Sequence, residues 1–273
     1  MKLNEHRSPP NAGRTVRSLV AGWAACRFSL EELPALRQRP GLLQGAQLPA
    51  SFLKHADEQT VAGIAAVSQA IESHGLNHTD FSSWGVIAAP RFLGRAALAV
   101  ALARFANEGA WGISPHLIPH RSLHALSGTV SQALKIHGPN YGVGGGADGA
   151  AEALLAGSAL LADGQVPGLW IVLTGFDPEL VPANPGAAEA PPCSTDCMAV
   201  ALALVSTDQR SHGPFLTVGA GQTSASDVAA LPEFDLEDFA GILHSGETSA
   251  RRRLRCGGWV GWEHAETAVE MCP

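Results

Sequence analysis

The sequence predicts an α/β fold in which a mainly parallel mixed sheet carries helices on both faces. Short apolar runs without polar alternation recur along the chain, as is typical of strands that are buried on both sides. Longer segments with helical spacing separate these runs, and such an order of elements favours parallel pairing. The chain of 273 residues is 46% hydrophobic and 16% charged, so it can bury a large core.

The first half of the chain supplies two strands and three helices. We expect the strands at 16–25 and at 84–89, where the second run ends at Pro90. The apolar positions of the helices recur at intervals of three and four residues. The helices are expected at 52–74, 91–108 and 122–136.

The second half begins with a strand at 139–143 that enters a run of glycines. The helix expected at 147–162 is apolar almost all round, which predicts that it is a buried central helix. Asp148 and Glu152 near its start suit the positive end of a helix dipole. Further strands are expected at 169–174, 198–205 and 215–219.

Three parts follow from this pattern along the chain. Residues 1–15 are polar and predict a flexible leader, and residues 16–227 hold the α/β elements. Residues 228–273 are more polar, and we expect them to form an irregular C-terminal extension.

Charge and composition exclude several classes of protein. The chain has 18 basic and 25 acidic residues, so it lacks the basic footprint of a nucleic-acid-binding protein. Its apolar runs are shorter than the roughly 20 residues that a membrane helix needs. An odd number of cysteines, five, argues against a disulfide scaffold. We therefore expect a cytoplasmic protein that contacts neither membrane nor nucleic acid.

The glycine run lies between a predicted strand and a helix N-terminus, where a chain can bind an anion or carry a nucleophile. Gly144–Gly149 fits a dinucleotide fingerprint loosely, but it lies in mid-chain and no acidic residue follows about 20 positions later. A phosphate-binding P-loop would need Gly-Lys-Ser/Thr, which is absent. A nucleophile elbow needs Cys, Ser or Thr, and residues 142–152 contain none. The pattern has the geometry of an elbow without its chemistry.

The segment 113–140 (ISPHLIPHRSLHALSGTVSQALKIHGPN) resembles the stretch that precedes the nucleophile in β-ketoacyl synthases of the thiolase superfamily. The resemblance covers about 16–227 and is most specific at 113–177. It implies a thiolase-like fold, the N-terminal half of a ketosynthase. In that family the elbow carries a catalytic cysteine, and alignment places either Gly146 or Ala147 there. The degenerate elbow comprises Gly144, Gly145, Gly146, Ala147 and Asp148.

The family's two catalytic histidines belong to a second half of the fold, which this sequence does not contain. His244 stands in a faint echo of one histidine motif, and we interpret that echo as coincidence. We also interpret His116, His120, His124 and His137 as surface or interface residues. We therefore expect no catalytic residue, no cofactor and no metal.

The resemblance implies a non-catalytic subunit of the chain-length-factor type. The opening VAGWAAC, at 20–26, is similar to short forms in aryl-polyene-type pathways. The family implies pairing with a catalytic ketosynthase and contact with an acyl carrier protein, as a hetero- or homodimer in fatty-acid or polyketide biosynthesis.

Two alternatives stay open. A stand-alone acyltransferase could use a displaced nucleophile such as Cys193 or Cys197. A binding module could hold an acyl group, a coenzyme A or a carrier protein, with Arg251, Arg252 and Arg253 as candidate phosphate ligands.

A zinc site is a weaker alternative still. It would need Cys193 with Cys197, or Cys256 with His264 and Cys272, whose spacings do not match the usual templates.

Overall fold

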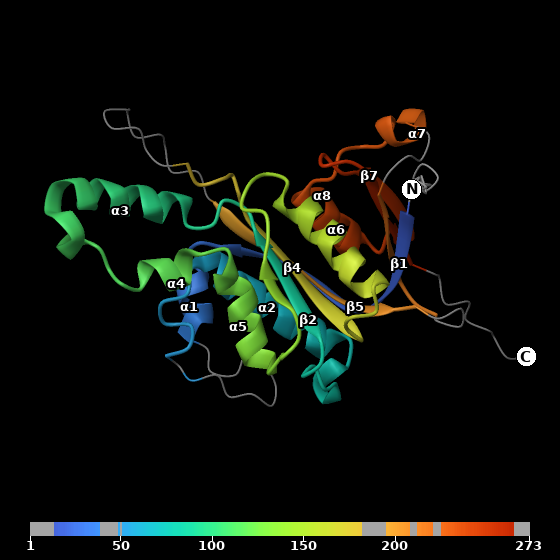
Figure 1. The fold of residues 1–273 in the computed structure, drawn as a ribbon, viewed down its shortest axis with the longest axis horizontal. Helices are drawn as coiled ribbons and strands as arrows, with labels where there is room; N and C mark the ends of the chain where they lie inside the picture. Colours follow the sequence, from blue (N-terminus) through green and yellow to red (C-terminus); the bar gives the residue numbers. More distant parts are fainter. Residues whose placement is uncertain are drawn as a thin grey trace, which may run out of the picture.

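The computed structural model describes residues 14–38, 49, 51–181, 195–207, 212–220 and 225–264. Its core is one eight-stranded sheet in the order β3-β2-β4-β5-β1-β6-β8-β7, with helices on both faces (Figure 1). The strands are β1 (Arg14–Ser29), β2 (Gly85–Pro90), β3 (Asn140–Gly142), β4 (Gly168–Asp177), β5 (Asp196–Ser206), β6 (Phe215–Ala220), β7 (Ser249–Arg253) and β8 (Trp259–Glu263). The mixed sheet with helices on both faces, expected from the sequence, is confirmed.

Parallel pairing was expected to predominate, but among the described strands it is confined to β3, β2 and β4. The other neighbouring strands pair antiparallel. An apolar strand covered on both faces has the same composition in either direction, so the sequence could not reveal this. The first strand also runs further than expected, to Ser29, with a bulge between Val20 and Gly22.

Helices pack on both faces of the sheet, and one face carries more of them than the other (Figure 1). On one side lie α1 (Leu33–Gln38), α2 (Glu58–Ser73) and α5 (His124–Leu134), and on the other α6 (Gly149–Ala162) and α8 (Leu236–Ser245) (Figure 1). The remaining helical segments are α3 (Arg95–Glu108), α4 (Leu117–Arg121), α7 (Ala225–Ala229) and the short 3-10 turns η1 (Leu76–His78) and η2 (Gly109–Gly112).

The central strand β5 divides its side chains by size. Cys197, Ala199, Ala201 and Ala203 face the layer of α2, and they are small. The alternate residues Val200, Leu202 and Leu204 face α6 and α8. Successive strand residues point to opposite faces, so this alternation lets α2 approach the sheet closely while large side chains fill the other core.

Helix α2 is the most deeply buried helix of the described chain. Asp57 caps its N-terminus by accepting a hydrogen bond from the Thr60 amide at 2.6 Å. Twelve of its sixteen residues are buried. At Gly63 a Cβ atom would lie 2.6 Å from Leu126, so the close packing of α2 against α5 and the sheet requires glycine.

Helix α6 is buried on one face only. Ala151, Leu154 and Leu161 pack on the sheet, whereas Ala159 and Ala162 are exposed. The expectation of a central helix buried all round therefore holds only for the sheet-facing side. Its low-polarity outer face has no partner among the described elements.

The region 228–273 was expected to be irregular, and its described part is not. Residues 236–245 form α8, and the β7–β8 hairpin extends the sheet beyond β6. Asp235 caps α8 through the Glu237 amide at 3.0 Å. Of the expected leader, residues 14 and 15 belong to β1, and the rest lies outside the described residues.

Helix α3 projects away from the sheet (Figure 1). We call residues 95–121, which span α3, η2 and α4, the arm. Six of the eight large apolar side chains that are exposed in the described part of the chain belong to it. They are Leu98, Val100, Leu102, Phe105, Trp111 and Ile118. None of the described helices is long and apolar enough to cross a bilayer.

We expect Leu202→Ala to lower the free energy of unfolding by about 2–5 kcal/mol, because it leaves a cavity in the fully buried core between β5 and α6. Urea denaturation monitored by circular dichroism measures this. The exposed Val100→Ala serves as the control, with a change within about 0.5 kcal/mol. Equal losses for both variants would contradict the packing described here.

Candidate functional site

The glycine run forms a tight turn between β3 and α6. Gly144 and Gly145 have φ angles of 77° and 99°, in the region that favours glycine. At Gly142 a Cβ atom would lie 2.1 Å from the carbonyl oxygen of Leu123. These three glycines are therefore required by backbone conformation or by close approach.

The residues that follow the turn occupy the place expected of a nucleophile. Gly146 and Ala147 are exposed, and a Cβ atom at Gly146 would meet no neighbour within 4 Å. Asp148 is the N-cap residue of α6, although its side chain makes no capping hydrogen bond. Neither Gly146 nor Ala147 has a group that can form a covalent acyl intermediate.

Two small cavities, of about 90 and 30 Å³, adjoin Ala147. Both are also lined by Arg91, Phe234 and Asp235. The segment 233–236, which leads into α8, therefore lies directly beside the elbow. The candidate site therefore consists of the glycine turn and the segment 233–236.

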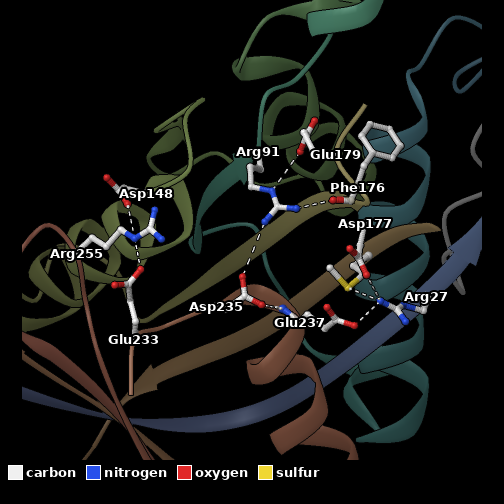
Figure 2. A network of polar contacts seen from close by, with 11 residues as sticks. Arg27, Arg91, Asp148, Phe176, Asp177, Glu179, Glu233, Asp235, Glu237 and Arg255 are labelled. Atoms are coloured by element: carbon white, nitrogen blue, oxygen red, sulfur yellow. Dashed lines mark hydrogen bonds and ion pairs between the residues drawn. The ribbon is translucent and has the colours of Figure 1, made fainter. Parts of the chain in front are cut away.

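Ion pairs join the elbow to that segment (Figure 2). Arg255, after β7, lies 3.9 Å from Asp148 and also pairs with Glu233. Both of its partners are carboxylates. This arginine is thus occupied by protein groups and links the start of α6 to the C-terminal strands.

Arg91 sits at the end of β2 and is the most enclosed cation of the site. Its side chain pairs with Glu179 at 3.3 Å and reaches Asp235 at 4.0 Å. It also donates to the carbonyl oxygen of Phe176 at 2.5 Å (Figure 2). Burial raises the pKa of Glu179, and the nearby guanidinium of Arg91 partly opposes that rise.

A third arginine, Arg27 of β1, lies among three carboxylates. It pairs with Glu237 at 2.7 Å, Asp177 at 2.8 Å and Asp196 at 3.6 Å. The contacts with Asp177 and Glu237, which Figure 2 shows, connect the ends of β1 and β4 to the start of α8. The contact with Asp196 adds the start of β5. The arginines near the elbow hold the C-terminal segment in place instead of offering free positive charge.

The arginines proposed from the sequence as phosphate ligands lie on the edge strand β7. Arg252 pairs with Asp238 at 2.5 Å, and Arg253 pairs with Glu233 at 3.3 Å. Arg251 lies over the Trp259 ring at 4.9 Å. All three thus have partners within the chain.

Of the two cysteines proposed as displaced nucleophiles, Cys197 is inaccessible. Cys197 is fully buried on β5, and burial strongly raises the pKa of its thiol. Cys26 is buried as well, and burial raises its pKa to about 11. Cys256 is exposed, whereas Cys193 and Cys272 lie outside the described residues.

No described histidine lines the two small cavities beside the elbow. His244 lies at the far end of α8 and its Nδ1 contacts Ala240 of its own helix at 2.9 Å. His124 begins α5 and contacts Ser127. Across the part of the chain that the structure describes, no group of three or more His, Cys, Asp or Glu side chains is arranged to hold a metal ion.

A larger cavity, of about 280 Å³, lies between the N-terminus of α2 and the base of the arm. Phe92, Leu93 and Phe176 form part of its apolar wall. Arg121 reaches Asp57 at 3.4 Å on its polar side. Nothing in the sequence pattern had singled out this cavity.

The sequence pattern did not single out Arg27, Arg91 or Asp235, and it indicated Arg255 only as part of the basic cluster that begins at Arg251. One signal was present, because Asp235 is followed by apolar residues at helical spacing and by two acidic residues in the first turn. That pattern predicts a capped helix where we expected irregular chain. The ion-pair partners lie up to 210 positions apart, and no local pattern reveals such pairs.

Solved structures of similar architecture identify the fold. The ishigamide ketosynthase/chain length factor matches with a TM-score of 0.52 and 16% identity, over 74% of this chain and 65% of that one. A type II polyketide acyl-carrier protein in complex with its ketosynthase, AntDE:AntF, gives a TM-score of 0.50 and 14% identity, over 71% and 63%. Ketosynthase twelve of the bacillaene synthase of Bacillus amyloliquefaciens gives 0.51 and 11%, over 77% and 46%.

These likenesses show that the chain has the ketosynthase-type, thiolase-like fold expected from the sequence. The chain spans less than two thirds of the length of each of these three structures. No protein-family model and no curated protein sequence matches it.

We expect a thiol reagent at pH 8 to label Cys256 at least about a hundredfold faster than Cys26 or Cys197 in the native chain, because a thiol of pKa about 11 is only about one thousandth ionised. Peptide mass spectrometry with iodoacetamide measures the rates. Unfolding in urea is the control and should equalise them. Rapid native labelling of Cys197 would instead favour the displaced nucleophile.

We expect Arg91→Met to lower stability by about 1–3 kcal/mol, because it leaves the half-buried Glu179 without its cationic partner. A carboxyl whose pKa is raised costs most where it is ionised, so the loss should be greater at pH 8 than at pH 5. Urea denaturation at both pH values tests this. Arg104→Met, which breaks an exposed pair with Glu108 on α3, should change stability by under about 0.5 kcal/mol.

Proposed function

We propose that this chain is a non-catalytic, ketosynthase-like subunit of the chain-length-factor type. It pairs with a catalytic β-ketoacyl synthase in the cytoplasm and forms part of the wall against which a growing acyl chain extends. The acyl carrier protein contacts this pair during fatty-acid or polyketide synthesis.

The elbow is the observation that carries the proposal. The chain keeps the strand, the strained glycine turn and the helix N-terminus, but Ala147 stands beside the small cavities where acyl transfer would need a nucleophile. Carboxylates already occupy the guanidinium groups of Arg91 and Arg255 around it. A role in assembly with a partner explains why the chain keeps the fold although the turn carries no nucleophile.

The arm supports a partner. No described side chain of α3 is buried, and Val100, Leu102 and Phe105 are more than half exposed. Trp111 in the following turn is fully exposed. A run of exposed apolar side chains of this kind marks an interaction surface. The outer face of α6 adds further surface of low polarity.

A stand-alone acyltransferase of the same fold is the second candidate. This candidate needs a cysteine outside the elbow as its nucleophile, and the burial of Cys197 argues against that residue. The candidate therefore depends on Cys193, which lies outside the described residues.

The third candidate function is that of a binding module without catalytic activity. Its phosphate ligands would be Arg251, Arg252 and Arg253. Binding would have to compete with the ion pairs of the last two, so coenzyme A should raise the melting temperature little.

The test is co-purification with the ketosynthase encoded in the same genome neighbourhood. We expect the two proteins to form a stable complex, and the ketosynthase alone to give products of altered length. Phe105→Asp combined with Trp111→Asp should weaken pairing at least about tenfold, because each places a charge on the apolar surface of the arm. Size-exclusion chromatography, biolayer interferometry and product analysis measure these outcomes.

Val181→Asp is the matched control, because Val181 is also an exposed apolar residue but lies off the arm. It should leave pairing unchanged. A chain that stays monomeric, does not bind the ketosynthase and does not change product length would contradict the proposal. Equal effects of the arm and control variants would reject the arm as the interface.

A further inference from the structure

Three histidines from two separate segments meet at the base of the arm. His55 precedes α2, and His116 and His120 belong to the end of the arm. The His55 and His116 rings stack face to face, with centroids 4.6 Å apart and planes 3° from parallel. The His120 ring lies 5.7 Å from the first and 6.2 Å from the second.

This arrangement suits neutral imidazoles. Stacked rings can face one another at this distance without charge, whereas two imidazolium ions so placed would repel. The pKa of His120 is lowered, first by burial and then by His55 and His116. Parallel stacking also turns the ring faces, and not the ring nitrogens, toward each other.

The charged groups around the cluster offer no surplus of negative charge. Arg121, next to His120, pairs with Asp57 at 3.4 Å, and Arg37 pairs with Glu58 at 3.1 Å. Lys54, next to His55, adds a third cation. Asp57 is further committed as the cap of α2 through its other oxygen. A protonated histidine here would therefore meet carboxylates that are already paired with arginines.

The same contacts hold the end of the arm to the body of the molecule. Helix α4 touches the segment before α2 through the histidine stack and through the pair of Arg121 with Asp57. The side chain of Arg121 also packs at Gly94, where the arm begins, so a Cβ atom there would lie 3.0 Å from it. Loss of the stack would thus loosen one of the two attachments of the arm.

We propose that the three histidines form a latch whose pH-sensitive member is His120. The latch holds α4 against the segment before α2 while the His120 ring is neutral, and releases it when that ring takes up a proton. A histidine whose pKa is lowered binds fewer protons in the docked state than in the released state. Docking is therefore strongest above about pH 6.5, the ordinary histidine value, and weakens as the pH falls below it.

One consequence rests on the function proposed above: the latch would set the position of the apolar arm, so acidification would weaken pairing with the ketosynthase. The latch itself belongs to the isolated chain. It can therefore be tested without any partner, and its failure would leave the proposed function untouched.

Hydrogen exchange with mass spectrometry on the full chain, corrected for the intrinsic effect of pH, measures the latch. We expect protection in 51–57 and 113–121 to fall by up to about fivefold from pH 6.5 to 5.5, because a single histidine with an ordinary pKa of about 6.5 in the released state is already half protonated at pH 6.5. Protection in β4 should stay constant. In His120→Phe, which keeps beside the stack an aromatic ring that cannot titrate, protection should persist at pH 5.5.

The control is His78→Gln, which removes an exposed histidine outside the cluster and should keep the wild-type response. Protection in 51–57 and 113–121 that is equal at both pH values, or absent at both, would overturn the latch. The latch would also be overturned if His120→Phe lost protection as the wild type does, or if the response disappeared in the His78→Gln control.

Discussion

The separation of small and large side chains on the central strand β5 is the constraint on which the rest of this structure depends. On β5 the cysteine and alanines face α2, and valine and leucine side chains face α6 and α8. Helix α2 can therefore lie close to the sheet, with Gly63 at the contact with Leu126. A shift of register by one residue would exchange the two faces, so the pairing of β4, β5 and β1 is strongly specified.

The candidate site follows from that packing. Helix α6 packs on the large-residue face, and its N-terminus therefore meets the ends of β2 and β3, where the glycine turn lies. Helix α8 packs on the same face, which brings Phe234 and Asp235 beside Ala147. The turn keeps its positive φ angles at Gly144 and Gly145 although no nucleophile depends on them. Close packing of the turn against α5 and α6 is sufficient reason for glycine at 142 and 144.

The sequence alone predicted most strands and helices and the glycine elbow, because these rest on local patterns. It did not predict the antiparallel direction of β5 and β6, since a strand buried on both faces has the same apolar composition in parallel and antiparallel pairing. The cap at Asp235 was overlooked although its pattern was local. The ion pairs of Arg27 and Arg91 could not be predicted, because their partners become neighbours only when distant strands pair. The stack of His55 and His116 is likewise a product of tertiary structure.

The position of β1 governs the order in which this chain can fold during synthesis. The first strand pairs with β5 and β6 and with no strand made before them. Residues 196–220 must therefore leave the ribosome before β1 has a partner. At about 5–20 residues per second, this delay amounts to roughly 10–40 s. Throughout that interval a long apolar strand with unpaired edges is available to chaperones and to other nascent chains.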